Sequence, residues 1–443
     1  MKLRFAPSPT GLLHVGNARV AILNALVARR HGAGLLLRLD DTDATRSRPE
    51  YAEAIRHDLR WLGVEWDEEA VQSARLDRYA VAADRLRRAG RLYPCFESEE
   101  ELAAKREMRI KRHQPPLYDR AMLKLTAAQR ESAEAGGKRP YWRFLLSERP
   151  VAWDDIVLGR REVKVSSLSD PVLVRADGTP LYTLTSVVDD LELGITHVVR
   201  GEDHVTNTGV QLDIMAALKA PMDALRFGHA PLMVEADGGK LSKRAGAVTL
   251  RGLRQDGIER DALVGYLAGL GTGDDPWPGD IAAHAPSFDL AGLSRSPPRF
   301  DGGTLLALNR KTLGKLDFEA VRDRLPSGAT SAFWNAVRGN LDMLGEARGW
   351  WDVVAGQIVP PVIEGEGEFL RDAAQSLPAE PWDEAVWDHW TGALKQSAGR
   401  KGRALYRPLR LALTGEEHGP ELRALLPLMG RARAAERLRL AAS

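Results

Sequence analysis

The feature that most limits the fold lies near the start of the chain, where a strand, a loop, a helix and a second strand follow one another. Residues 3–5 are strand-like, and residues 6–11, Ala-Pro-Ser-Pro-Thr-Gly, favour a loop because proline and glycine interrupt regular structure. Residues 17–30 have apolar side chains at helical spacing, and residues 34–39 are a short apolar run. Two buried strands joined by a crossover helix form a βαβ unit, so the sequence predicts an α/β fold with a parallel sheet.

The rest of the chain divides into segments of different character. The α/β pattern continues to a strand-like run at 93–96, gives way to a charged helical stretch and β-rich pieces within 97–186, and returns with a strand-like run at 196–200. Beyond residue 251 the pattern is mainly helical, with a Pro/Gly/Asp-rich break at 271–280. We therefore expect an α/β domain of residues 1–96 and 187–250, an insertion at 97–186, and helical regions at 251–305 and 306–443.

The amino-acid composition limits the cellular compartment and the binding partners that we expect. The single cysteine, Cys95, permits neither an internal disulfide nor a zinc cluster of several cysteines, so we expect a reducing, cytoplasmic setting and no structural zinc. We find no apolar run long enough to span a membrane. The formal net charge is +1, so nucleic-acid binding would depend on local patches. Residues 351–390 have nine acidic and one basic side chain, and residues 401–443 have nine basic and four acidic, although such runs are also typical of solvated helix faces.

Two short motifs could bind a nucleotide. The first is Pro7-Ser8-Pro9-Thr10-Gly11-Leu12-Leu13-His14-Val15-Gly16-Asn17, which leads from the first strand into the helix. Backbone N–H groups at a helix N-terminus bind phosphate, and a histidine there can donate to a phosphate oxygen. The second is Lys240-Leu241-Ser242-Lys243-Arg244, whose lysines could close over a polyphosphate. Taken singly, each motif is more often a surface turn than a nucleotide site.

Together, the two motifs resemble the signatures of class I aminoacyl-tRNA synthetases. His14-Val15-Gly16-Asn17 is similar to the His-Ile-Gly-His motif, and residues 240–244 are similar to the Lys-Met-Ser-Lys-Ser loop. Further segments resemble the bacterial glutamyl-tRNA synthetases over nearly the whole chain, namely residues 4–11, 38–43, 187–190, 200–204, 402–410 and 413–415. The resemblance implies a Rossmann-type catalytic domain, an insertion that binds the acceptor end of tRNA, a stem-contact region at 251–305, and an all-helical anticodon-binding region at 306–443.

The resemblance also implies the roles of individual residues. The residues expected to bind glutamate are Arg4, Ala6, Ser8, Asp40, Tyr182, Ser186 and Arg200. The residues expected to bind ATP are Thr10, His14, Gly16, Asn17, Asp203, Met233 and Lys243. His14, Lys240 and Lys243 are the expected catalytic residues, and Arg46 and Asn340 are the expected tRNA contacts. Arginines suit a carboxylate substrate because a guanidinium can donate two parallel hydrogen bonds to it.

Three positions depart from the family pattern. Asp40 stands where glutamate is usual, so its reach toward a substrate ammonium is one methylene shorter. Ser186 stands where asparagine is common. Around Cys95 some relatives have a zinc-binding cysteine cluster, but Glu97 replaces the second cysteine here, so the sequence predicts that zinc does not bind.

The expected function is ATP-dependent attachment of L-glutamate to the 3′ end of tRNA through a glutamyl-adenylate, with Mg²⁺ on the phosphates and no protein nucleophile. We expect a monomer. The partner tRNA stays open between tRNA(Glu) and tRNA(Gln), because Asn340 falls near an anticodon-reading arginine of discriminating relatives. A glutaminyl-tRNA synthetase is the closest alternative, although its anticodon region is typically a β-barrel. A nucleotidyltransferase, a tRNA-modifying relative and a non-catalytic RNA-binding paralogue are more distant alternatives.

Overall fold

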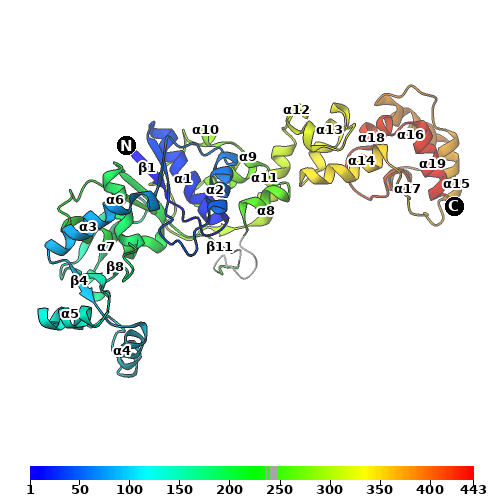
Figure 1. Cartoon of the computed structure of the whole chain (residues 1–443). Coiled ribbons are helices and arrows are strands. Elements are labelled where there is room, and N and C mark those ends of the chain that lie inside the picture. The colour runs from blue at the N-terminus through cyan, green and yellow to red at the C-terminus, as the bar shows by residue number, and fades with distance from the viewer. Residues whose placement is uncertain (236, 240–247) are drawn as a thin grey trace. The chain divides into compact units, whose positions relative to one another are not determined.

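The computed structural model describes residues 1–235, 237–239 and 248–443. The chain forms two compact units (Figure 1). The first unit consists of residues 1–252 and 264–301, and the second of residues 253–263 and 302–443. None of the described helices combines the length and the apolar character that crossing a membrane requires.

A parallel sheet organises the first unit. Within the described ranges it has five strands in the order β10-β9-β1-β2-β3. Their bounds are Lys2–Phe5 for β1, Gly34–Leu39 for β2, Glu68–Val71 for β3, His197–Gly201 for β9 and Arg226–Ala230 for β10. The predicted βαβ unit is confirmed, since β1 pairs in parallel with β2. Strand β3 was not predicted, because this edge strand is Glu-Glu-Ala-Val and has no apolar run.

Helices cover the sheet and bury its apolar faces. Helix α1 runs from Val15 to His31, two residues earlier than the apolar spacing predicts, because His14 caps its N-terminus. Ile22, Leu23 and Leu26 of this helix are fully buried. The other helices of the unit are α2 (Pro49–Trp61), α3 (Leu76–Arg88), α6 (Tyr182–Glu192), α7 (Val205–Ala217) and α10 (Ile281–His284). Helix α8 (Leu250–Gln255) begins in the first unit and ends in the second, and helix α9 (Arg260–Gly269) begins in the second unit and ends in the first.

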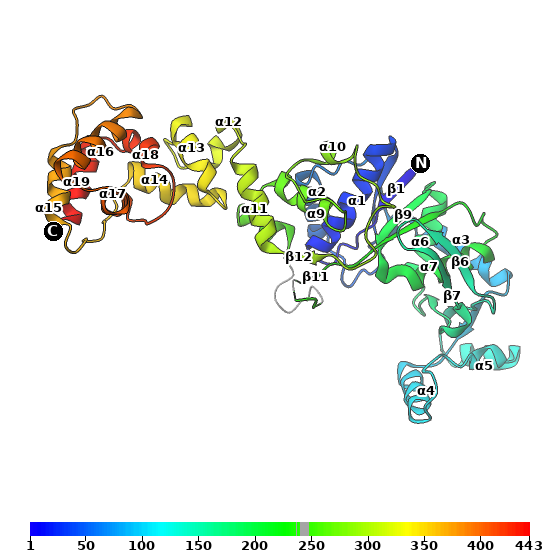
Figure 2. The same cartoon turned by 180° about the vertical axis from the view of Figure 1, so that it is seen from behind.

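The segment between β4 and α6 is built differently. Strands β4 (Leu92–Cys95), β5 (Tyr141–Phe144) and β8 (Val172–Val174) form an antiparallel sheet, so the strand predicted at 93–96 pairs with the insertion and not with the parallel sheet. Strands β6 (Val151–Asp155) and β7 (Gly159–Val163) form a hairpin that packs beside α7 (Figure 2). Helix α4 (Glu99–Lys111) and helix α5 (Ala127–Ala135) have no fully buried side chain.

The second unit is helical. Its longer helices are α11 (Gly302–Leu313), α13 (Ser331–Val337), α14 (Ala347–Ala355), α15 (Gly367–Gln375), α16 (Ala385–Ser397), α17 (Arg403–Thr414), α18 (Leu422–Met429) and α19 (Arg431–Ala441), and α12 (Phe318–Val321) is a single turn. The tryptophans of this unit belong mainly to its core, since Trp334 and Trp390 are fully buried and the others pack against the buried clusters. Residues 253–263 join this unit because Asn309 binds the N–H of Glu259 at 2.7 Å and the carbonyl of Gly257 at 3.1 Å.

Many basic side chains near the C-terminus are used inside the second unit. Arg437 is 2% exposed and donates to the carbonyl oxygens of Val353, Leu413 and Gly356. Burial, with a smaller effect of Arg433, lowers the pKa of Arg437 to about 10. Arg433, Arg410, Arg407, Arg423 and Arg431 also donate to carbonyl or carboxylate groups of the unit. Lys401, Arg403, Arg407, Arg423, Arg431 and Arg439 are exposed. Part of the positive charge of residues 401–443 therefore serves to hold this unit together.

Candidate active site

The candidate site lies at the carboxyl ends of the central strands of the sheet. From β1 the chain proceeds to β2 and β3 on one side, whereas β9 and β10 lie on the other side of β1. The strand order thus reverses between β1 and β9, which is where open α/β sheets form ligand-binding crevices. Arg4, Arg38 and Arg200 lie on the neighbouring strands β1, β2 and β9.

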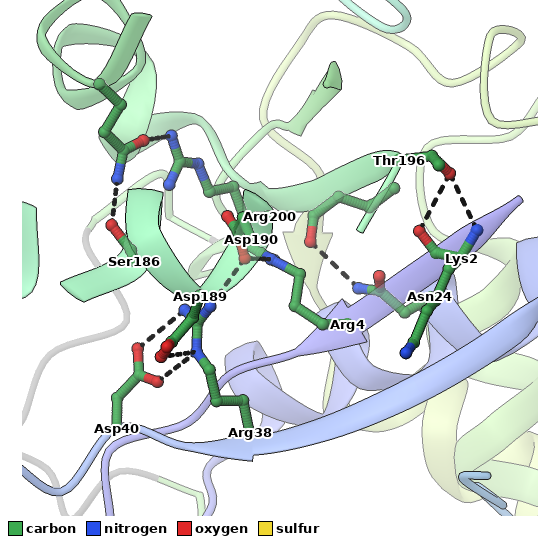
Figure 3. Close-up of polar contacts among 12 residues, drawn as sticks. Lys2, Arg4, Asn24, Arg38, Asp40, Ser186, Asp189, Asp190, Thr196 and Arg200 are labelled. Carbon is green, nitrogen blue, oxygen red and sulfur yellow. Dashed lines mark hydrogen bonds and ion pairs between the residues drawn. The ribbon is translucent and has the colours of Figure 1, made fainter. Parts of the chain in front are cut away.

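A cluster of buried charges surrounds these strand ends (Figure 3). Arg4 Nε donates to Asp190 Oδ1 at 3.2 Å, and Arg38 Nη1 donates to the same oxygen at 2.7 Å. Arg38 also binds both oxygens of Asp40, at 2.7 and 3.2 Å. Asp189 accepts from Gln72, Arg75 and Tyr79. These contacts join residues far apart in the sequence into one network of hydrogen bonds and ion pairs.

The electrostatics of the cluster follow from burial and pairing. Burial raises the pKa of Asp40, and the attraction of Arg38 only partly offsets this effect. Burial acts in the same direction on Asp190, but Arg4, Arg38 and Arg200 outweigh it and lower the pKa of Asp190. The pKa of Arg38 is raised because the neighbouring carboxylates outweigh the cost of burying its charge.

Arg200 differs from Arg4 and Arg38 in its partners. It is 5% exposed, and every group bonded to it is neutral in charge. Its bonds are Nη1 to Tyr182 OH at 3.0 Å, Nη2 to Thr208 Oγ1 and to Gln211 Oε1 at 2.6 Å each, and Nε to His229 Nε2 at 3.3 Å. Burial lowers the pKa of Arg200, and the charge of Arg4 adds to the effect. Among the described residues, Arg200 therefore holds a buried positive charge that no carboxylate contacts directly.

Helix α6 contributes one face to the site. Tyr182, Ser186 and Asp190 follow one another at intervals of four residues, so they share a face of the helix. Ser186 is fully buried and its Oγ accepts from Gln211 Nε2 at 2.6 Å. The structure thus places Ser186 behind Arg200, where it orients Gln211, and not on the cavity wall.

A cavity of about 140 Å³ opens beside this cluster. Five residues that the sequence assigned to substrates line it together, namely Ser8, Thr10, Asp40, Arg46 and Tyr182. Thr42, Asp43, Gln72, Arg175, Thr179, Pro180 and Leu181 complete the wall and were not predicted. Arg46 is 71% exposed at this wall and pairs with Asp43 at 2.7 Å.

A larger cavity of about 390 Å³ lies in the insertion, away from these groups. Three of its four basic residues are already engaged. Lys105 pairs with Glu97 and Asp119, Arg109 donates to the Pro115 carbonyl, and the Arg143 guanidinium lies 4.0 Å from the centre of the Tyr118 ring. The smaller cavity is therefore the better candidate for the site of reaction.

His14 shapes the start of helix α1. Its Nδ1 accepts the N–H groups of Gly16 and Asn17 at 3.1 and 3.3 Å, and the Asn17 side chain accepts the N–H of His14. Because Nδ1 accepts, the ring proton lies on Nε2, which is thus a donor. A Cβ at Gly16 would come within 2.9 Å of the imidazole, so only glycine permits this contact. Thr249 forms a β-bridge with His14, which fixes the chain after residue 247 beside the helix start.

The remaining predicted residues lie in several places. Ala6 directly follows β1, Asp203 is half exposed after β9, and Met233 is buried after β10. Lys240 and Lys243 lie outside the described residues. Asn340 belongs to the second unit, where it is exposed at the end of the short helix Arg338–Asn340.

The environment of Cys95 does not suit zinc. Burial raises the pKa of the Cys95 thiol to about 11, whereas zinc requires the thiolate. Glu97 is used by the Lys105 ammonium and by the Tyr118 hydroxyl, which donates at 2.6 Å. Among the described residues, no three His, Cys, Asp or Glu side chains are grouped as metal ligands. The absence of zinc stays a prediction.

Several residues of the site were missed at the sequence level. Arg38, Asp189 and Asp190 lie in motifs that pointed to the family, but nothing in their local pattern indicated that they pair. Thr208, Gln211 and His229 surround Arg200 without any local signal, since their relevance depends on how α7 and β10 pack against β9.

Comparisons with known proteins give a consistent result. Residues 1–277 match the family described as tRNA synthetases class I (E and Q), catalytic domain, and residues 363–442 match an anticodon binding domain. The chain is 64% identical to glutamate–tRNA ligase 2 of Acidiphilium cryptum and 61% identical to that of Gluconacetobacter diazotrophicus, with 100% of both chains covered in each case. Among solved structures, glutamate–tRNA synthetase of Elizabethkingia anophelis matches with a TM-score of 0.89 at 24% identity, covering 100% of this chain and 99% of the other.

Proposed function

The chain belongs to the class I tRNA synthetases for glutamate and glutamine, and we propose that it attaches L-glutamate to the 3′ end of tRNA, with ATP as the second substrate. Relatives named as glutamate–tRNA ligases match it over their full length at 61–64% identity, and this supports glutamate over glutamine as the amino acid. The proposal is further supported by one observation in the site, the buried guanidinium of Arg200.

The arginines of the cluster differ in their direct partners. Arg4, Arg38 and Arg75 each contact at least one carboxylate. Arg200 contacts neutral groups only. The side-chain carboxylate of glutamate beside Arg200 and Tyr182 would pair with this guanidinium, whereas the amide of glutamine would bring no charge to it. Asp40, on the cavity wall, would receive the substrate ammonium.

In the reaction that we propose, the α-carboxylate of glutamate attacks the α-phosphorus of ATP. A bond forms between the carboxylate oxygen and phosphorus, pyrophosphate leaves, and the terminal ribose hydroxyl of tRNA then displaces AMP from the glutamyl-adenylate. This chain's residues would hold the reactants and stabilise charge: the Nε2–H of His14 and the positive end of the α1 dipole would act on the phosphates, and Lys243 would contribute a further positive charge. Thr10, Gly16, Asn17, Asp203 and Met233 would contact the nucleotide. Mg²⁺ would neutralise phosphate oxygens, which are its main ligands in such sites.

The tRNA contacts are assigned to three regions. We assign the acceptor end of the tRNA to the insertion at 97–186, with Arg46 at the cavity rim. Residues 251–305 would contact the stem of the tRNA, and residues 306–443 would bind the anticodon. Arg338 is half-buried and donates to the Leu316 carbonyl at 2.9 Å, whereas the neighbouring Asn340 is exposed. An asparagine there is the basis for keeping tRNA(Gln) as an alternative to tRNA(Glu). We further propose a monomeric, cytoplasmic enzyme without zinc.

Aminoacylation of purified tRNA(Glu) and tRNA(Gln), each with glutamate and with glutamine, tests the function. We expect charging with glutamate, and an Arg200→Met variant should raise the KM for glutamate by about 10²–10³-fold, because a buried carboxylate loses its charged partner. The KM for ATP should not change. The matched control is Arg226→Met, an exposed arginine on β10. Charging with glutamine alone, or an unchanged glutamate KM in Arg200→Met, would contradict the proposal.

A further inference from the structure

Arg200 is held from behind by His229. The two residues lie opposite each other in the parallel pair β9 and β10, and Arg200 Nε donates to His229 Nε2 at 3.3 Å. His229 is fully buried, and burial lowers its pKa, so the ring is neutral. A guanidinium has donors only, so Nε2 of His229 must be the acceptor and the ring proton must lie on Nδ1.

The other ring nitrogen contacts a carboxylate from the insertion. His229 Nδ1 donates to Asp155 Oδ2, at the end of strand β6. Asp155 is 4% exposed, and its Oδ1 accepts the N–H groups of Val157, Leu158 and His229 at 3.0–3.1 Å. Burial would raise the pKa of Asp155, but the hydrogen bonds from His229 and the backbone lower it to about 2. Asp155 is therefore ionised and rigidly fixed, and it selects the Nδ1–H form of His229.

This arrangement places a negative charge near Arg200 without placing a carboxylate on it. Arg4, by comparison, is paired directly with Asp190. A carboxylate in direct contact with Arg200 would neutralise the charge that attracts a substrate carboxylate. The imidazole keeps the Asp155 carboxylate off the guanidinium, while it still orients the guanidinium through Nε.

We propose that Asp155 and His229 are positioning residues that orient Arg200 toward the substrate carboxylate and thereby set the preference for glutamate over glutamine. This inference rests on the proposed function, because it takes Arg200 as the residue that binds that carboxylate. It also assigns a part of the amino-acid pocket to the inserted segment: the hairpin that contains Asp155 is fixed to β10 by a hydrogen bond from the Ile156 N–H to the Phe227 carbonyl at 2.8 Å.

Two substitutions at position 229 distinguish a role of His229 in orienting Arg200 from a purely structural role. In His229→Gln the amide oxygen can lie near the former Nε2 and still accept from Arg200. In His229→Asn the shorter amide lies near the former Nδ1, so it keeps the contact with Asp155 and loses the contact with Arg200. We expect His229→Asn to raise the KM for glutamate by about 10-fold or more, as for loss of a hydrogen bond to a charged group. The KM for ATP and kcat should stay unchanged, and His229→Gln should restore the glutamate KM.

Asp155→Asn provides the second test. Its amide can donate to His229 Nδ1, so the ring proton moves to Nε2. Two donors, His229 Nε2–H and Arg200 Nε–H, then face each other and cannot form a hydrogen bond. The variant should again raise the glutamate KM and reduce the preference over glutamine. Its matched control is Asp154→Asn, the exposed neighbour that pairs with Arg160, which should behave as the unsubstituted chain.

Calorimetric titration with L-glutamate and with L-glutamine, together with thermal denaturation, completes the experiment. Weaker glutamate binding in folded His229→Asn, with recovery in His229→Gln, supports the proposal even if Asp155→Asn does not fold. Equal losses of kcat and melting temperature in both His229 variants, or unchanged glutamate binding in the folded variants, would overturn it. A chain that binds glutamate but charges no tRNA would contradict the proposed function alone, and a chain that binds no glutamate would contradict both.

Discussion

Arg38 Nη1 donates to Asp190 Oδ1 at 2.7 Å across 152 positions of sequence, and both side chains are nearly inaccessible to solvent. The same guanidinium binds Asp40 and approaches Asp189 to 3.8 Å. One arginine therefore contacts three carboxylates, and these contacts tie β2 to helix α6 beneath the site.

Replacing Arg38 with methionine should lower the free energy of unfolding of the first unit. Removing one partner of a buried ion pair costs about 3–5 kcal/mol, because the remaining charges stay buried without compensation. Urea denaturation measures the change in the free energy of unfolding. The control is Arg160→Met, whose ion pair with Asp154 is exposed and should contribute less than about 1 kcal/mol. Similar losses for the two variants would show that the Arg38 cluster is not an important source of stability.

A Gly16→Ala substitution should reduce the rate of adenylate formation without loss of stability. The new Cβ would lie 2.9 Å from the His14 ring, and the ring would have to leave the N–H groups that it caps. Loss of one positioned donor typically lowers the rate by about 10²–10³-fold. Single-turnover adenylate formation with tRNA present measures the effect. Gly392→Ala is the control, since a Cβ there meets nothing within 4 Å, and equal rates in both variants would contradict the role of His14.

The local parts of the fold were predictable from the sequence, and the contacts between them were not. Strands β1 and β2 and helix α1 have apolar spacing and loop residues that mark their bounds to within two residues. Strand β3 lacks such a signal, because it is held by pairing with β2 and not by its own apolar residues.

The same division applies to the site. Arg4, Asp40, Tyr182 and Arg200 were found because they lie in motifs typical of the family, and the structure brings them to one group of neighbouring strands and helices. The partners of Arg200 could not be found in this way. Asp155 and His229 meet across 74 positions of sequence, and only the packing of the β6–β7 hairpin against β10 gives them a role.

The stability of the chain should fall as the pH drops below neutrality, and His204 should cause part of this loss. Burial lowers the pKa of His204 to about 4 in the folded chain, with the charge of Arg200 adding to the effect, whereas the unfolded chain binds this proton near pH 6.5. Between these values the unfolded state holds more protons, so the free energy of unfolding rises with pH by up to ~1.4 kcal/mol per pH unit for one proton. The contribution of neutral His204 to the free energy of unfolding is thus fully present above pH 6.5 and is lost toward pH 4.

A His204→Gln variant should therefore show a shallower dependence of stability on pH between 6.5 and 4. Urea denaturation at a series of pH values in this range measures the slope. The control is His418→Gln, an exposed histidine whose replacement should leave the slope as it is. A slope in His204→Gln that equals the original would mean that protonation of His204 does not oppose folding.

Within the second unit, only the exposed basic residues should contribute to the dependence of tRNA binding on salt. Each contact between a cation and a phosphate adds about 0.7–0.9 to the slope of log K against log salt. A Lys401→Ala/Arg403→Ala double variant should therefore reduce the slope by about 1–2. Arg437→Ala should leave the slope unchanged and lower stability instead, because it removes a buried donor from three carbonyl groups. Measured tRNA affinities over a salt series, with folded protein in each case, decide between the two roles: a lower slope in folded Arg437→Ala would show that this arginine reaches the RNA and that the internal contacts do not hold it.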